Sequence, residues 1–170
     1  MNIKIIFKSR VSAKSNGNLI LFVDERFNIS GLKKHIHNSE YSYITDLLKK
    51  KDSQKKIITF DISSKKKIIL VSLKKNLTTS DAENLGAKCY VILSELKDTE
   101  YSVNSDTIPN GLKNITGYFL HGIKLKSYKF EKYKTKKSKG DISINVIGKY
   151  IPNHKNQLKF NSIEEGTFYT

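Results

Sequence analysis

The chain has 170 residues, a net charge of +15, 38% hydrophobic residues and 10% aromatic residues. This length suits one domain, and the apolar content is enough for a hydrophobic core, which excludes an intrinsically disordered chain. The single cysteine, Cys89, excludes an internal disulfide framework, and no apolar run is long enough for a signal-peptide core or a membrane span. We therefore expect a soluble protein in a reducing, cytoplasmic setting.

The positive charge comes almost entirely from lysine, because Arg10 and Arg26 are the only arginines among 31 basic residues. Such an excess suggests an anionic partner, either a nucleic acid or an acidic protein surface. The alternative is a plain solvated surface in a protein from an A/T-rich genome, since lysine, isoleucine and asparagine share A/T-rich codons. The scarcity of arginine favours this alternative, because nucleic-acid readers use arginine for bidentate contacts.

The first half of the chain predicts strands and short helices. Residues 3–7 mostly alternate between apolar and polar, as in a β-strand, and residues 19–23 form a continuous apolar run typical of a strand buried on both faces. Apolar residues recur at helical spacing over residues 30–50, which predicts one or two short amphipathic helices. Residues 57–62 and 68–73 predict two strands of a hairpin.

The second half of the chain predicts two longer helices and two strands. Ser80 and Glu83 match a capping box, so we expect a helix that begins at Ser80 and continues to Leu96. The further predicted elements are a strand within residues 99–108, a helix over residues 112–126 and a strand over residues 142–146.

The last residues predict the start of another helix, because Ser162 and Glu165 match a second capping box and the sequence ends at Thr170. A helix that short is marginal alone, so we expect residues 1–161 to form one domain and residues 162–170 to begin an inter-domain helix of a longer protein. The alternation of strands and helices predicts a three-layer α/β/α fold, and the hairpin makes its sheet mixed.

No residues match a catalytic, cofactor-binding or metal-binding pattern. His35 and His37 are two positions apart and share no helix face, while His121 and His154 are far away in sequence, so exposed or packing roles are expected. Cys89 lies on the apolar stripe of its predicted helix, as a buried unreactive thiol would. The chain also lacks the motifs G-x-x-x-x-G-K and G-x-G-x-x-G, which bind nucleotide phosphates. We expect no enzyme activity from this chain alone.

One segment is a candidate for contacts with an anionic partner. Residues 132–139 form a very basic predicted loop beside Tyr128, Phe130 and Tyr133. Basic side chains among aromatic ones can bind a nucleic-acid backbone and stack on bases, and a solvated loop beside packed aromatics is the alternative. The candidate contacts are Lys132, Lys134, Lys136, Lys137 and Lys139.

Residues 122–137 resemble a signature near the end of the amino-terminal domain of the leucyl (cytosol) aminopeptidase family. There a helix with a late glycine leads into L-x-x-Y-x-F-x-x-Y-K, and the matching positions are Leu125, Tyr128, Phe130, Tyr133 and Lys134. Three other stretches resemble the family in the same order: residues 67–73 its central strand, residues 81–96 the next helix, and residues 163–167 the helix into the catalytic domain. Lys74 departs from the family, which commonly has a glycine after the central strand.

The resemblance implies a macro-domain-like fold outside the catalytic core of a bacterial aminopeptidase. The family's enzymes release amino-terminal residues from peptides with two divalent metal ions, usually zinc, manganese or magnesium, held in a separate catalytic domain. Residues 79–84 are only superficially similar to its metal-binding stretch, since the glycine and arginine that should follow are missing. No catalytic or metal-binding residue is therefore carried over to this chain.

Three hypotheses follow from the sequence. The leading one is a non-catalytic amino-terminal aminopeptidase domain, over residues 1–161, that helps to assemble a hexamer and controls access to the active site. In some bacterial members of the family this domain also contributes to DNA binding. The second is a nucleic-acid-binding module that uses the lysine-rich segment. The third is a macro-like domain that binds an ADP-ribose-type ligand, which rests on fold analogy alone.

Overall fold

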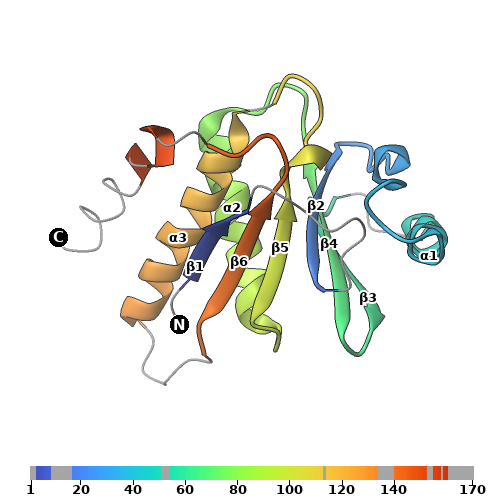
Figure 1. The fold of residues 1–170 in the computed structure, drawn as a ribbon, viewed down its shortest axis with the longest axis horizontal. Coiled ribbons are helices and arrows are strands. Elements are labelled where there is room, and N and C mark those ends of the chain that lie inside the picture. The colour runs from blue at the N-terminus through green and yellow to red at the C-terminus, as the bar shows by residue number, and fades with distance from the viewer. Residues whose placement is uncertain are drawn as a thin grey trace.

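The computed structural model describes residues 3–8, 17–50, 54–112, 114–133, 140–152, 155–157 and 159–160. Its strands are β1 (Ile3–Phe7), β2 (Leu19–Asp24), β3 (Ile57–Ser63), β4 (Lys66–Leu73), β5 (Glu100–Asn104) and β6 (Ile142–Ile147) (Figure 1). Its helices are α1 (Asn38–Leu48), α2 (Thr79–Glu95) and α3 (Ile115–Tyr133), with 3₁₀ turns η1 (Ser30–Leu32) and η2 (Ser105–Thr107). This order agrees with the predicted order of strands and helices.

The six strands form one mixed sheet in the order β1-β6-β5-β2-β4-β3. All neighbouring pairs are parallel except β3 and β4, which form the predicted antiparallel hairpin. Strand β2 lies inside the sheet, and residues 19–23 are all buried, as the continuous apolar run predicts.

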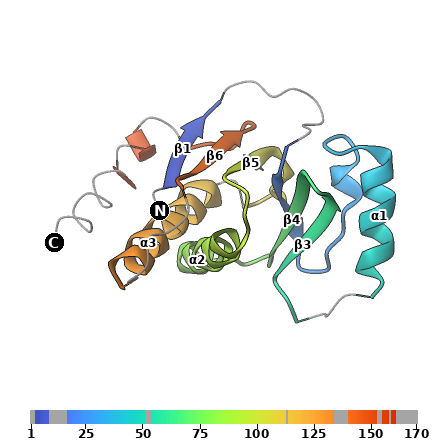
Figure 2. The ribbon, with the colours of Figure 1, turned by 90° about the horizontal axis from the view of Figure 1, so that it is seen from below.

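Helices cover both faces of the sheet, which confirms the predicted three-layer α/β/α fold (Figure 2). Strand β2 shows how the two cores form, because successive side chains of a strand point to opposite faces. Ile20 and Phe22 pack in the larger core with α2 and α3, whereas Leu19, Leu21 and Val23 pack in the smaller core with α1. No helix of the described part is long and apolar enough to cross a membrane.

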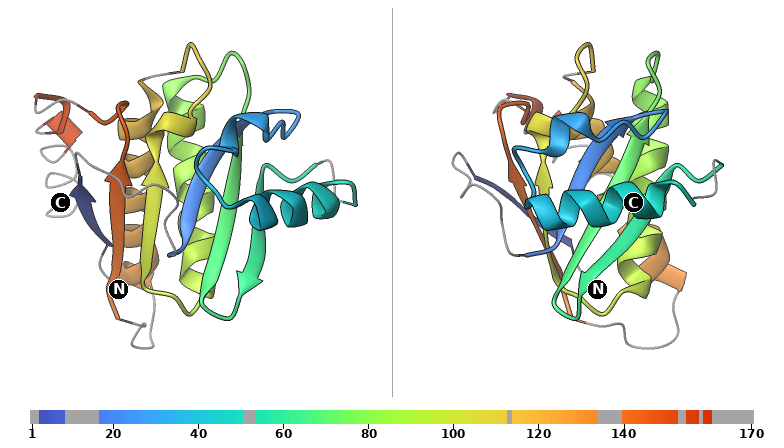
Figure 3. Two further views of the ribbon diagram at one scale, coloured as in Figure 1. Left: turned by 45° about the vertical axis from the view of Figure 1, so that its right-hand side comes forward. Right: turned by 90° about the vertical axis from the view of Figure 1, so that its right-hand side faces the viewer.

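Two glycines allow α2 and α3 to pack backbone against backbone. A Cβ atom on Gly86 of α2 would meet the backbone carbonyl of Phe119, and one on Gly122 of α3 would meet the backbone carbonyl of Glu83. The two helices therefore lie side by side along the sheet (Figure 3). Gly122 is the late helix glycine of the sequence signature, and this contact gives it a structural role.

The start of α2 differs from its prediction. The cap residue is Thr78 and not Ser80: the Thr78 hydroxyl accepts the Asp81 backbone N–H at 3.0 Å, and the Asp81 carboxylate accepts the Thr78 backbone N–H at 3.0 Å. The helix therefore begins at Thr79. The reason is that the motif of a hydroxyl residue followed three positions later by an acid occurs twice in this stretch, and Thr78 has the extended backbone that a cap requires.

The end of α3 and the extent of β5 also differ from their predictions. Helix α3 runs to Tyr133 instead of residue 126, so that Lys132 lies in the helix and not in a loop. Residues 127–133 include two lysines and a glutamate, which favour helix, and this extends α3 past the last strongly apolar turn. Strand β5 ends at Asn104, and the 3₁₀ turn η2 follows. The predicted helix start at residues 162–165 lies outside the described residues.

Candidate functional site

The sheet has a topological switch point between β2 and β5. These strands are parallel neighbours, yet the chain leaves β2 for η1 and α1 on one face and leaves β5 through η2 for α3 on the other. In open α/β sheets, ligands bind in the crevice that such diverging connections leave at the carboxyl ends of the strands. The crevice between the β2–α1 and β5–α3 connections is therefore the first place to search for a site.

A cavity of about 530 Å³ lies in this crevice, and we call it the switch-point cleft. Its polar lining residues are Asp24, Asn28, Ser30, Lys34, Asp106, Thr107 and Asn110. Its charged groups are thus two carboxylates and one ammonium, and this balance does not complement a ligand that carries several phosphate charges.

Asp24 shapes the β2 side of the switch-point cleft. One of its carboxylate oxygens accepts backbone N–H groups from Arg26 and Asn28, each at 3.0 Å. Phe27, between them, has a positive φ of 57°, which is rare for a bulky residue, and its ring is buried in the smaller core. The buried ring and the two hydrogen bonds hold this strained turn in place.

Hydrogen bonds also fix the β5 side of the switch-point cleft. The Thr107 hydroxyl accepts the Phe22 backbone N–H at 2.9 Å and donates to the Asn104 carbonyl at 2.7 Å, so the loop is tied to β2. The Asp106 carboxylate accepts the Lys149 backbone N–H at 2.7 Å, which ties the same loop to the residues after β6. These hydrogen bonds hold the loop after β5 against β2 and against the residues after β6.

His35 lies beside the switch-point cleft and has a defined tautomer. Asn104 uses its side-chain oxygen to accept the Asp106 N–H at 3.0 Å, so its amide nitrogen donates to His35 Nδ1 at 3.1 Å. Nδ1 is therefore unprotonated, and the proton lies on Nε2, which is buried without a hydrogen-bond partner in the described structure. Burial lowers the pKa of His35, the Lys34 ammonium lowers it further, and the Asp106 carboxylate opposes them. His35 is neutral near pH 7.

The other residues considered from the sequence lie apart. His37 is exposed beside the start of α1, His121 is buried on α3, and His154 lies outside the described residues. Cys89 is fully buried, as predicted, and burial raises the pKa of its thiol to about 12. Among the residues that the structure describes, no three histidine, cysteine or acidic side chains lie close enough to hold a metal ion.

The candidate anion contacts are only partly described. Lys132 lies in the last turn of α3, and Lys134, Lys136, Lys137 and Lys139 lie outside the described residues. Sequence reasoning missed Asp24 and Asp106, although polar residues directly after apolar strands are a signal for sites at strand ends.

No protein-family model matches the sequence, and no curated protein matches it. Solved structures are similar in fold. A mutant tomato leucine aminopeptidase superposes with a TM-score of 0.63 and 13% identity, over 98% of this chain and 36% of the other chain. The macrodomain of Thermus aquaticus DarG superposes with a TM-score of 0.52 and 9% identity, over 87% of this chain and all of the other. The chain is therefore macrodomain-like in fold and spans about a third of the aminopeptidase's length.

Proposed function

We propose that this chain is the non-catalytic amino-terminal domain of a leucyl aminopeptidase. The observation that carries the proposal is the similarity to tomato leucine aminopeptidase, which extends over 98% of this chain but only 36% of the other protein. A share of that size is what one domain of a larger enzyme would occupy. The sequence supports the same function, since residues 125–134 follow the signature of this family.

In this proposal the domain acts through contacts with the rest of the enzyme. It packs against a catalytic domain that holds two divalent metal ions, helps to assemble a hexamer in the cytoplasm, and limits access to the active site. The fixed architecture of the domain suits this role, because Gly86 and Gly122 lock α2 to α3, and Thr107 ties the β5–α3 loop to β2. A rigid body can hold subunits in one orientation.

A reconstitution experiment tests the proposal. The pure chain is mixed with a leucyl aminopeptidase from which the amino-terminal domain has been removed. We expect native mass spectrometry to show one copy of the chain for each catalytic domain. The chain alone is the control, and we expect it not to hydrolyse a leucyl amide with zinc, manganese or magnesium. Metal-dependent hydrolysis by the chain alone would overturn the proposal, as would a failure to bind the catalytic domain.

A second candidate function is binding of a small molecule in the switch-point cleft. The position of this cleft and the macrodomain-like fold favour it, whereas its two carboxylates disfavour an ADP-ribose-type ligand. Gly31 provides the test, because it lines the cleft and a Cβ atom added to it would meet no atom within 4 Å, so a larger side chain can be introduced there. Calorimetry with ADP-ribose supports this function if the unmodified chain shows saturable heat of binding and Gly31→Phe does not. The absence of heat with the unmodified chain excludes ADP-ribose as the ligand.

A further inference from the structure

A second cavity, of about 330 Å³, lies at the carboxyl end of β4, where the chain turns into α2 (Figure 1). We call it the lysine cavity. The turn after β2 contributes Glu25 and Phe27 to its lining, and residues 54–56, directly before β3, contribute as well. It shares no lining residue with the switch-point cleft, although Asp24 and Asn28 of the same turn line that cleft. The turn therefore borders both cavities.

Helix α2 presents one face to the lysine cavity. Its lining residues there are Asp81, Asn84, Leu85 and Lys88. Residues three or four positions apart lie on the same side of a helix, so these four residues form one continuous wall.

Hydrogen bonds and an ion pair fix the strand side of the lysine cavity. Ser72 of β4 donates twice to the Lys56 carbonyl, from its backbone N–H at 2.8 Å and from its hydroxyl at 3.0 Å. These bonds hold the backbone of Lys56 in place directly before β3. The ammonium of Lys74 lies 3.2 Å from the Asp81 carboxylate, which ties the end of β4 to the first turn of α2.

The lining carries more positive than negative charge. Its described charged residues are four lysines and two acids: Lys55, Lys56, Lys74, Lys88, Glu25 and Asp81. Lys74 and Asp81 neutralise each other through their ion pair. The other three lysines and Glu25 form no ion pair within the described part of the chain. Three ammonium groups thus remain against one carboxylate, and this excess attracts an anion.

The lysine cavity also offers apolar surface. Leu77 lines it and is only half-buried, whereas Phe27 and Leu85 are almost fully buried in the two cores. The lysine stems add methylene groups, because long charged side chains lie along apolar surface while they keep the ammonium in water. Both parts of an amphipathic anion therefore find complementary groups.

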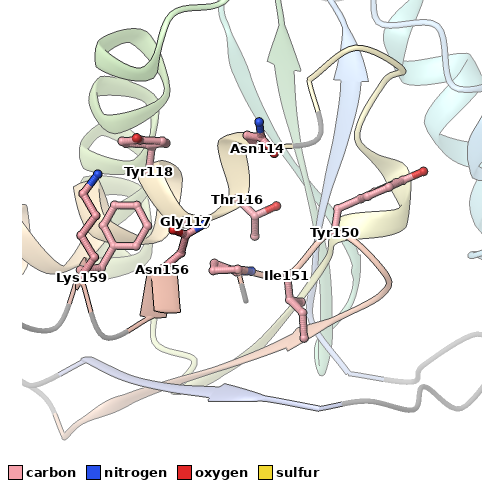
Figure 4. Close-up of a pocket in the computed structure, with 10 residues that line it drawn as sticks. Asn114, Thr116, Gly117, Tyr118, Tyr150, Ile151, Asn156 and Lys159 are labelled. Carbon is pink, nitrogen blue, oxygen red and sulfur yellow. The ribbon is translucent and has the colours of Figure 1, made fainter. Parts of the chain in front are cut away.

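The cavity beside the start of α3 has a different character (Figure 4). Its volume is about 290 Å³, and Lys159 is the only charged residue of its described lining. The described lining of the switch-point cleft has one ammonium and two carboxylates. Of these three cavities, only the lysine cavity brings several ammonium groups together.

We propose that the lysine cavity binds a small organic acid, in which a carboxylate is attached to an apolar body. Lys56 and Lys88, on different walls, attract the carboxylate, and the apolar body lies against Leu77 and the lysine stems. Glu25 disfavours a polyphosphate, because it would repel a ligand with several negative charges. This binding is independent of any aminopeptidase role and of the switch-point cleft.

The test is a nuclear magnetic resonance titration of the whole chain with sodium phenylacetate. Sodium acetate has the same charge without the apolar body, and 2-phenylethanol has the body without the charge. All titrations are made at the same ionic strength, so that general screening is equal. We expect saturable shifts of the Leu77, Leu85 and Lys88 amide signals with phenylacetate, at an affinity at least about tenfold above that for either comparison compound.

Charge variants assign the binding to the proposed groups. Lys56→Gln and Lys88→Gln together should weaken phenylacetate binding about tenfold. The control removes the same net charge outside the cavity, with Lys97→Gln and Lys149→Gln together, and should leave the affinity unchanged. All four side chains are exposed, so the melting temperatures should stay close to that of the unmodified chain.

Glu25→Gln gives a result of opposite sign. It removes the one unpaired carboxylate of the described lining, so binding should strengthen about twofold. Equal affinities for phenylacetate and acetate would overturn the proposal, as would equal losses in the two double variants or no gain in Glu25→Gln. Binding of an acidic peptide by a chain that gives no saturable shift with phenylacetate would also overturn it and would assign this surface to a protein partner.

Discussion

The ammonium nitrogen of Lys66 lies 2.8 Å from a carboxylate oxygen of Glu40, and both side chains are only 7% exposed. The second oxygen of Glu40 accepts the backbone N–H of His37 at 2.9 Å, at the start of α1. One carboxylate therefore both stabilises the first turn of α1 and anchors this helix to the first residue of β4. This ion pair joins the outer helix to the hairpin at the edge of the sheet.

Replacing Lys66 by methionine should destabilise the protein strongly. The substitution keeps most of the side-chain volume but leaves the Glu40 carboxylate buried without its cation. Breaking a buried ion pair in this way typically costs about 3–5 kcal/mol. Urea denaturation should show a decrease of this size in the free energy of unfolding of Lys66→Met.

The matched control for that variant is Lys65→Met, one residue earlier in the same run of lysines. Lys65 is exposed, so its replacement should change the free energy of unfolding by no more than about 0.5 kcal/mol. Equal unfolding midpoints for the two variants would show that the ion pair contributes nothing to stability.

Replacing Gly86 or Gly122 by alanine should also destabilise the protein, although alanine favours helix over glycine by about 1 kcal/mol. The new methyl group would meet a backbone carbonyl of the facing helix, which cannot turn aside as a side chain can. We expect a net loss of at least about 2 kcal/mol in the free energy of unfolding for each variant. Gly31→Ala is the control, because its methyl group meets no atom within 4 Å, and it should unfold like the unmodified chain.

The order and type of the elements follow from local patterns in the sequence. The continuous apolar run at residues 19–23 predicts an inner strand, and the short polar turn between residues 57–62 and 68–73 predicts the hairpin. Hydrophobic periodicity determines these features, and it depends only on near neighbours. The predicted capping residue of α2, Ser80, was wrong by two positions. Thr78 and Ser80 are both followed three residues later by an acidic residue, so the local motif does not distinguish them.

The sites could not be predicted in this way, because they depend on which distant segments meet. Lys66 looks in the sequence like Lys65 and Lys67, and only the packing of α1 against β4 makes it the buried one. The switch-point cleft exists because β2 lies beside β5, which the local pattern of neither strand encodes. The lysine cavity likewise gathers lysines from three separate segments, which only the packed structure brings together.

His35 should make the stability of the protein sensitive to mild acid. Burial lowers its pKa below the ordinary 6.5, the nearby Lys34 acts in the same direction, and Asp106 opposes them. The unfolded chain then binds the proton more readily than the folded one. The contribution of neutral His35 to the free energy of unfolding is fully present above the pKa that His35 has in the unfolded chain. It is lost as pH falls through and below that value. Protonation would also place an N–H of the ring against the amide of Asn104, which already donates to it.

The measurement is the free energy of unfolding of the unmodified chain and of His35→Gln at several pH values between about 5 and 7.5. We expect a steeper loss toward acid in the unmodified chain, since the variant lacks the titrating ring of His35 and is otherwise the same chain. Parallel curves would show that the His35 pKa is the same in the folded and unfolded states.

The nucleic-acid hypothesis predicts that DNA binding depends on the lysines of residues 132–139 and not on lysines over the whole surface. If residues 132–139 contact phosphates, replacing Lys132, Lys134, Lys136 and Lys137 by glutamine should weaken binding to duplex DNA at low salt. It should also reduce the slope of log K against log salt concentration by about 0.9 for each lost contact. Fluorescence anisotropy with labelled DNA at several salt concentrations measures both quantities.

The control must have the same net charge, because a chain of charge +15 attracts DNA over its whole surface. Replacing the exposed Lys50, Lys75, Lys97 and Lys149 by glutamine removes the same number of charges from other regions. A dedicated lysine segment requires that the first variant loses far more affinity than the second. Equal losses would identify the binding as unspecific attraction, and the lysine content would then reflect only a solvated surface and the codon usage of the gene.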